Sequence, residues 1–246
     1  MKLILLRHGE SQWNLENRFT GWEDVSLTES GIDEAMFSGH QLLESDIQIK
    51  SIYTSILKRA TETTKIVSDI LNFPQEKIQQ NWRLNERHYG ALQGLNKSET
   101  ALKYGEKQVL IWRRSYATSP PFLDKNDVRH PRFNHTFKNI KHELPVGESL
   151  KDVVNRISPF WGKYIKYIKE NLGNHLIVAH SNSLRAIVKT LDNLSDSDIT
   201  NVNIPTGVPL VYNLNDELAV INKKYLIDPK KLKTKLDVVV NQGKIK

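Results

Sequence analysis

Two apolar runs in this chain each end in a histidine. Residues 3–6 (LILL) lead directly into Arg7-His8-Gly9, and residues 175–179 (HLIVA) lead into His180. Short apolar runs followed by helical patterns are typical of strands in a parallel sheet, and neighbouring parallel strands end at the same edge. The carboxyl edge is where open α/β sheets bind their ligands. The sequence therefore predicts that both imidazoles emerge together at one ligand-binding edge.

The rest of the chain has the same strand and helix rhythm. Thr28 is a candidate cap for a helix whose inward face we expect to carry Ile32, Ala35, Met36, Gly39, Leu42 and Leu43. The remaining predicted elements are a strand at 51–55, helices at 58–71 and 183–191, a long helix capped by Ser149 with Asp152, and a strand at 210–212. This alternation predicts a single α/β domain over 1–246, with a mostly parallel central sheet and helices on both faces.

Two segments depart from that rhythm. Residues 82–145 carry aromatic residues, six arginines and several prolines with little periodicity, which is typical of an ordered lid or binding segment inserted into a domain. Residues 228–246 are rich in lysine and carry a glycine near the end, so we expect a basic, mobile tail.

Composition excludes several classes of site and partner. The chain has no cysteine, and its histidines outside the strand ends lack the spacing of a zinc site, so we predict metal-free chemistry. The apolar run before Arg7 is too short for a signal-peptide core, and no stretch is long enough to span a bilayer, which predicts a soluble cytoplasmic protein without a membrane partner. The net charge of +7 is compatible with nucleic acid, but the lysines are scattered, so we expect a solvated basic surface instead.

The first strand end carries the residues of a phosphoryl-transfer site. Neutral imidazole attacks phosphorus without a separate base, which makes His8 the candidate nucleophile. Arg7 offers a planar fork for phosphate oxygens, Gly9 allows close approach of the backbone, and Ser11 and Asn14 would complete the cradle.

Other residues are expected to complete the chemistry. Arg59, just beyond the strand at 51–55, would share the phosphoryl charge, and His180 would donate a hydrogen bond to the equatorial oxygens. The transfer also needs a group that protonates the leaving oxygen. Position in the sequence leaves both Glu86 and Glu10 open for that role.

Several longer segments make the chain similar to the 2,3-bisphosphoglycerate-dependent phosphoglycerate mutases of the histidine phosphatase superfamily. The segments that carry this resemblance are RHGESQWN at 7–14, NRFTGW at 17–22, YTS at 53–55 with Arg59-Ala60, LNERHYGALQGL at 84–95, WRR at 112–114 and NIPTGVPLVY at 203–212. The RHG element is general to the superfamily, whereas NERHYG and WRR are typical of the mutase branch. The resemblance extends over essentially the whole chain.

This resemblance implies specific roles, a primer and an assembly. His8 would become a phosphohistidine primed by 2,3-bisphosphoglycerate, Glu86 would donate and accept the proton, His180 would stabilise the transition state, and the protein would be a homodimer. The substrates implied are small phosphoglycerates, interconverted between the 3-phospho and 2-phospho forms in glycolysis and gluconeogenesis. The substrate-binding residues implied are Arg7, His8, Gly9, Glu10, Ser11, Gln12, Trp13, Asn14, Thr20, Gly21, Arg59, Glu86, Arg87, His88, Tyr89, Lys97, Arg113, Arg114, Ser181 and Asn182.

Two positions differ from the pattern of that family. Ser181 replaces the usual glycine after the second histidine, which adds a hydroxymethyl group beside the phosphate, and Gly147 replaces a usual threonine before Glu148. The nearest alternative function is a bisphosphoglycerate synthase or phosphatase on the same scaffold. A basic nucleic-acid-binding protein is a remote alternative, because it leaves the two histidine turns unexplained.

Overall fold

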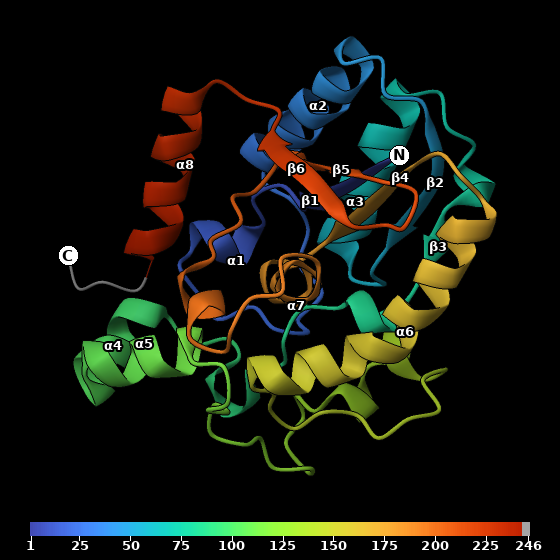
Figure 1. Ribbon diagram of the computed structural model, residues 1–246. Helices are drawn as coiled ribbons and strands as arrows, with labels where there is room; N and C mark the ends of the chain where they lie inside the picture. The colour runs from blue at the N-terminus through green and yellow to red at the C-terminus, as the bar shows by residue number, and fades with distance from the viewer. Residues whose placement is uncertain (243–246) are drawn as a thin grey trace.

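The computed structural model describes residues 1–242, which form an α/β structure around one six-stranded sheet (Figure 1). Its strands are β1 (Lys2–Arg7), β2 (Ile49–Thr54), β3 (Gln79–Gln80), β4 (Asn174–Ala179), β5 (Leu210–Leu214) and β6 (Val220–Tyr225), in the order β3-β2-β4-β1-β5-β6. The first four strands in this order run parallel, whereas β5 and β6 are antiparallel to their neighbours. The predicted fold class, a mostly parallel sheet with helices on both faces, is confirmed.

Helices pack on both faces of this sheet and fix its two cores. The elements α2 (Glu29–Glu44) and α3 (Lys58–Ile70) cover one face, and α6 (Leu150–Glu170) and α7 (Ser181–Leu191) cover the other (Figure 1). Strand β1 is fully buried, because Leu3 and Leu5 enter the core under α6 and α7 while Ile4 and Leu6 enter the core under α2. This burial on both sides explains why β1 is a continuous apolar run and not an alternating one.

The register of the central strands brings the two histidines together. Arg7 pairs with Ala179 at the carboxyl ends of β1 and β4, and the amide of His8 donates to the carbonyl of Ala179 at 3.0 Å. The rings of His8 and His180 lie with their centroids 4.9 Å apart. The prediction of one shared edge is therefore confirmed.

The helices α2 and α6 begin at their predicted N-caps, but the predicted buried face of α2 is wrong in part. Thr28 accepts a hydrogen bond from the amide of Gly31, and Ser149 and Asp152 form a capping box at the start of α6. In α2, Ala35, Gly39 and Leu42 are buried as expected, whereas Ile32, Met36 and Leu43 are exposed. The buried face of α2 instead includes Gly31 and Ser38, and a side chain at Gly39 would meet Ile70 of α3.

The segment 82–145 contains more regular structure than its sequence predicts. It includes the helices α4 (Lys97–Tyr104) and α5 (Glu106–Arg114) and four short 3-10 turns, at Trp82–Leu84, Gly90–Leu92, Pro131–Phe133 and His135–Phe137. Further elements that the sequence analysis did not predict are α1 (Gln12–Leu15), β3, β6 and two 3-10 turns, at Gln75–Lys77 and Asp198–Asn201.

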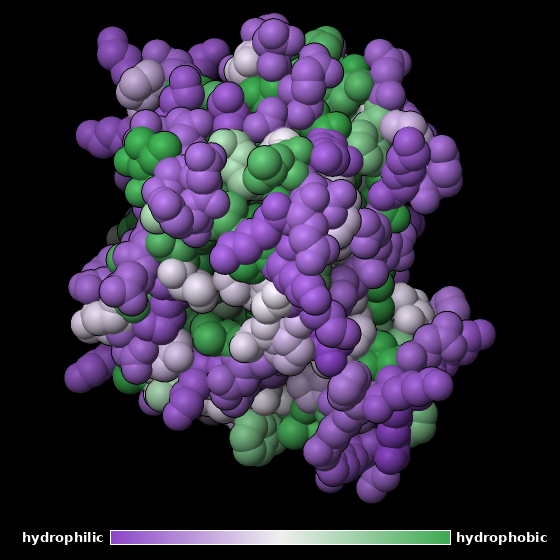
Figure 2. All heavy atoms as spheres, turned by 45° about the vertical axis from the view of Figure 1, so that its right-hand side comes forward, coloured by the Kyte–Doolittle hydropathy of each residue, from purple (hydrophilic) through white to green (hydrophobic). Residues whose placement is uncertain are grey.

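The end of the chain also differs from the expected mobile tail. Pro229–Asn241 form helix α8, capped by the Asp228 side chain, and Figure 1 shows this helix between α2 and the pair formed by α4 and α5. The part of the tail prediction that concerns 243–246 lies outside the described residues. Within 1–242, no helix combines the length and apolar character needed to cross a bilayer. The face drawn in Figure 2 is mostly hydrophilic, with small separate apolar patches.

Candidate active site

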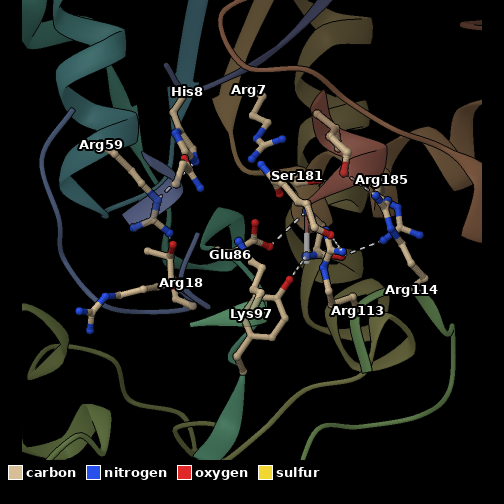
Figure 3. Close-up of a pocket in the computed structure, with 17 residues that line it drawn as sticks. Arg7, His8, Arg18, Arg59, Glu86, Lys97, Arg113, Arg114, Ser181 and Arg185 are labelled. Atoms are coloured by element: carbon tan, nitrogen blue, oxygen red, sulfur yellow. Dashed lines mark hydrogen bonds between the residues drawn. The ribbon is translucent and has the colours of Figure 1, made fainter. Parts of the chain in front are cut away.

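A narrow, strongly basic cavity lies at the carboxyl edge of the sheet (Figure 3). Its volume is about 50 Å³. The predicted site residues that line it are Arg7, His8, Asn14, Thr20, Gly21, Arg59, Glu86, Tyr89, Lys97, Arg113, Arg114, Ser181 and Asn182. Four lining residues were not predicted, namely Arg18, Arg185, Val239 and Gln242.

His8 is arranged as a neutral nucleophile. Its Nδ1 lies 2.6 Å from the carbonyl oxygen of Gly9, which can only accept, so Nδ1 carries the proton and the lone pair is on Nε2. Burial, and then the guanidinium groups of Arg59 and Arg7, hold the pKa of His8 well below its usual value. The ring therefore stays unprotonated at neutral pH, and Nε2 is available to attack phosphorus.

Arg59 and Arg7 present their charge to the His8 side of the cavity. Arg59 donates from Nε to His8 Nε2 at 3.3 Å and from its two terminal nitrogens to the carbonyls of Glu23 and Gly21. Burial lowers the pKa of Arg59 to about 10, so it remains a cation at neutral pH. Arg7 donates to the carbonyl of Ile204, while its Nε is buried without a hydrogen-bond partner among the described residues. That unpaired donor and its neighbours suit an anion bound next to His8.

His180 lies directly behind His8 and does not itself line the cavity. Its Nε2 is 2.6 Å from Ser55 Oγ, which also accepts from the amide of Leu57, and Nδ1 has no described partner. Burial, followed by the nearby Arg59 charge, keeps the pKa of His180 well below its usual value, so both rings are neutral.

The structure separates the two glutamates that position alone left open. Glu86 lines the cavity, and its Oε1 accepts from the amides of Arg87 and Asn182 at 2.7 and 3.2 Å. Glu10 does not line the cavity, because its carboxylate accepts from Thr28 at the start of α2. Of these two carboxylates, Glu86 is therefore the one that faces the cavity.

The outer part of the cavity comes from the inserted segment and from α7. Lys97, Arg113 and Arg114 reach in from α4 and α5, and Arg185 reaches in from α7 (Figure 3). Together with Arg7, Arg18 and Arg59, they bring seven basic side chains around Glu86, the one carboxylate among the lining residues that the structure describes. Burial lowers the pKa of Arg113 to about 10 and that of Arg185 to about 9. Such an excess of desolvated cations favours a ligand with more than one anionic group.

Gly9 has a different role from the one predicted. It does not line the cavity, and a Cβ atom there would lie 2.1 Å from the carbonyl oxygen of Gly31. The small residue is therefore required where the turn after β1 packs against α2, and not for approach to a ligand. Its amide donates to Thr63 Oγ1, which ties the His8 turn to α3.

The other predicted residues outside the cavity wall hold neighbouring segments in place. Ser11 is buried and donates to Asn14 Oδ1, Gln12 pairs with Glu16 at the surface, and Trp13 lies beside Arg18. Arg87 donates to the carbonyl of Arg113, and the amide of His88 donates to Glu148. None of these five residues lines the cavity, and their role as substrate contacts stays a prediction.

The lining residues that sequence reasoning missed carried only weak signals. Arg18 follows the turn after α1 and forms an ion pair with Glu16. Arg185 lies one helical turn beyond His180, and that spacing from the second histidine could have indicated it. Val239 and Gln242 line the cavity because the chain end folds back as α8, which nothing in their local sequence predicts.

Comparison with known proteins identifies the family. The sequence profile described as "Histidine phosphatase superfamily (branch 1)" matches residues 3–223. The chain belongs to this superfamily. Phosphoryl transfer is the chemistry that this superfamily supports. In this chain, His8 lies at the end of β1 beside Arg7, with the ring of His180 next to it.

Several solved structures share this fold over most of their length, at low sequence identity. A mycobacterial glucosyl-3-phosphoglycerate phosphatase is 21% identical with a TM-score of 0.66, covering 91% of this chain and 96% of that one. The alpha-ribazole phosphatase from Shigella flexneri is 21% identical with a TM-score of 0.66, covering 90% and 95%. Bacillus stearothermophilus YhfR is 24% identical with a TM-score of 0.65, covering 89% and 93%. At these identities the likeness shows the fold alone.

The two departures from the mutase pattern lie at different distances from the chemistry. Ser181 is the first residue of α7 and lines the cavity, so its hydroxyl is in reach of a bound anion. Gly147 packs under Phe122, and a Cβ atom there would lie 2.8 Å from the ring. The space that a threonine would fill is therefore occupied by Phe122. Within the described residues, no group of three or more His, Asp or Glu side chains is arranged to hold a metal ion.

Proposed function

We propose that this protein is a 2,3-bisphosphoglycerate-dependent phosphoglycerate mutase that interconverts 3-phosphoglycerate and 2-phosphoglycerate. The observation that carries the proposal is the second group of cations opposite His8. Arg7 and Arg59 already suit one phosphoryl group, and Lys97, Arg113 and Arg114 add charge for a second acidic group on the same ligand. A phosphoglycerate has a carboxylate and a phosphate, and its bisphosphate has one anion more.

In the proposed reaction, phosphate is carried on Nε2 of His8. A bond forms from Nε2 to phosphorus as the bond from phosphorus to the donor oxygen breaks, and the Glu86 carboxyl gives that oxygen its proton. Arg7 and Arg59 hold the equatorial oxygens throughout. In the return step, the acceptor hydroxyl gives its proton to the Glu86 carboxylate and attacks phosphorus, which frees His8.

A primer and a cover both follow from this mechanism. 2,3-Bisphosphoglycerate would phosphorylate His8 at the start, and the same bisphosphate would form and reorient during each cycle. Water must be kept from the phosphohistidine while the intermediate turns. Val239 and Gln242 of the chain end lie at the cavity wall, which supports α8 as part of that cover.

A phosphatase acting on the same ligands, or a bisphosphoglycerate synthase, is the second candidate. The phosphatase is favoured by the solved structures named above, two of which are phosphatases. A phosphatase passes the phosphoryl group from His8 to water, whereas a synthase releases the bisphosphate that a mutase retains. The cavity residues are compatible with each of them.

The test combines a phosphoenzyme assay with an isomerisation assay. Protein incubated with labelled 2,3-bisphosphoglycerate is expected to carry an acid-labile phosphoryl group that is absent in His8→Ala. Isomerisation of 3-phosphoglycerate faster than release of inorganic phosphate supports a mutase, and the reverse supports a phosphatase. Native-rate isomerisation by His8→Ala without a phosphoenzyme would refute both.

A further inference from the structure

A buried ion pair behind the cavity holds the loop that carries Glu86. Glu148 precedes α6 and Arg156 lies in its second turn, and their side chains are only 6% and 7% exposed. Arg156 donates from Nε and Nη2 to the two carboxylate oxygens of Glu148, at 2.6 and 3.1 Å. Neither residue lines the cavity, so the pair has no direct part in the proposed chemistry.

The remaining donors of this guanidinium all go to the backbone of one loop. Nη1 of Arg156 donates to the carbonyls of Arg83 and Asn85, and Nη2 donates to those of Asn85 and Glu86. Three carbonyls thus converge on a single cation. The backbone at 85–89 is neither helix nor strand, so it lacks the regular backbone hydrogen bonds of those elements. The bonds from Arg156 hold part of this backbone in their place.

Glu148 fixes the same loop from its other end. Its Oε2 accepts from the amide of His88 at 2.8 Å, and its own amide donates to the carbonyl of His88 at 2.8 Å. The Glu86 carbonyl also accepts from Trp22 Nε1 at 2.6 Å. The backbone on both sides of the Glu86 side chain is therefore held by the Arg156 guanidinium, the Glu148 carboxylate and the Trp22 indole, which lie outside the cavity.

We infer that the Glu148–Arg156 pair is a positioning device for Glu86, which sets the carboxyl group at the distance that proton transfer to the leaving oxygen requires. The inference rests on the proposed phosphoryl transfer. An arginine is needed because its planar fork reaches a carboxylate and three carbonyls at once, which the compact ammonium of lysine cannot do. A loop that relaxes by a fraction of an ångström would lose proton transfer while the cations that bind phosphate stay in place.

Two phosphoryl donors with different leaving groups distinguish a misplaced Glu86 carboxyl group from a general loss of activity. An alkyl phosphate such as 2,3-bisphosphoglycerate needs its leaving oxygen protonated, whereas p-nitrophenyl phosphate releases a stable anion without a proton. The experiment measures the single-turnover rate of His8 phosphorylation by both donors in the full-length protein. General acid catalysis contributes about 100-fold or more, so Glu86→Gln is expected to lose about that factor with the alkyl donor and little with the aryl donor.

Arg156→Lys and Glu148→Gln are expected to show the same selectivity in weaker form, with the alkyl rate lowered by about tenfold and the aryl rate by less than about twofold. Substrate concentration at half-maximal rate is expected to change little. Arg129→Lys is the matched control, because Arg129 also joins a carboxylate, Asp127, to a backbone carbonyl, Gln93, without touching the Glu86 loop. Thermal unfolding checks that each variant is folded.

The outcomes distinguish the two levels of the argument. Selective loss in Glu86→Gln with equal loss, or no loss, for both donors in the Arg156 and Glu148 variants overturns the positioning role alone. Equal loss for both donors in Glu86→Gln overturns the acid role of Glu86 as well. If Arg156→Lys does not fold, Glu148→Gln decides, since it keeps the side-chain volume and an acceptor for His88.

Discussion

Within the described residues of helix α8, Val239 is the one side chain that is buried. Val239 is 7% exposed, whereas its neighbours Val238 and Val240 are 61% and 46% exposed. Lys235 forms a partly exposed ion pair with Glu34, and the carbonyls of Val239 and Gln242 accept from Arg114 and Arg113. The helix is therefore expected to detach locally without unfolding the domain.

The free energy that Val239 contributes to holding α8 in place follows from the burial of its side chain. Burying a valine stabilises by about 1.5–3 kcal/mol and a partly exposed ion pair by about 1 kcal/mol or less, so Val239 contributes more to the docking of α8 than the Lys235–Glu34 pair. Val239→Ala removes two methyl groups, which is about 1.6 kcal/mol of lost burial. The gain in helix propensity from Val to Ala is about 0.5 kcal/mol and is shared by the same change at Val238 and Val240.

Hydrogen exchange of the α8 amides measures this population directly. The burial loss less the propensity gain leaves about 1.1 kcal/mol, so exchange is expected to rise about sixfold in Val239→Ala. It is not expected to rise in Val238→Ala or Val240→Ala, nor to change in the core strands. Water-driven loss of the His8 phosphoryl group is expected to rise in the same order. Equal exchange in all three variants would refute the reasoning, since it would show that burial of Val239 does not hold the helix.

Further measurements test the packing and the protonation of the site. Gly9→Ala is expected to destabilise by about 1–3 kcal/mol in chemical denaturation, because its Cβ meets the Gly31 backbone, while Gly162→Ala on the open side of α6 is expected to stabilise slightly. Phosphorylation of His8 is expected to continue undiminished as pH falls through 6.5, because burial keeps its pKa well below that value, and a half-loss near 6.5 would contradict this. Burial also lowers the pKa of His88 from 6.5 to about 3. The unfolded chain therefore binds a proton first, so stability falls by about 1.4 kcal/mol per pH unit below 6.5, and His88→Asn is expected to remove that contribution to the slope.

The central sheet was predictable because its strands are buried on both faces. A short, uniformly apolar run such as residues 3–6, followed by a helical pattern, favours a strand under two helical layers, and the same holds for β4. Strand β6 was not predictable in this way, because it lies at the sheet edge and four of its six residues are exposed. Helix α2 shows the opposite error, since Ile32 and Met36 follow the helical period and yet face outward.

The candidate site was predictable where backbone geometry alone places a side chain. His8 and His180 follow paired strand ends, so periodicity was enough to bring them together. Glu86 and Glu10 could be separated only by a tertiary contact, the bond between Glu10 and Thr28, which leaves no trace in spacing. The homodimer, the cytoplasmic location, the bisphosphate primer and the absence of nucleic-acid and metal partners stay predictions.

The division of the cavity between two sources has a functional consequence. Arg7, His8 and Arg59 come from strand ends and an adjoining helix, so the sheet dictates their geometry. Lys97, Arg113 and Arg114 come from the α4–α5 pair, and the last two also bind the carbonyls of the chain end. The phosphoryl-binding half is thus built on the core sheet, whereas the half that would recognise the rest of the substrate is tied to α8, which we expect to detach locally. Differences in substrate between proteins of this fold are therefore expected to arise from the inserted segment and α8, and not from the histidine edge.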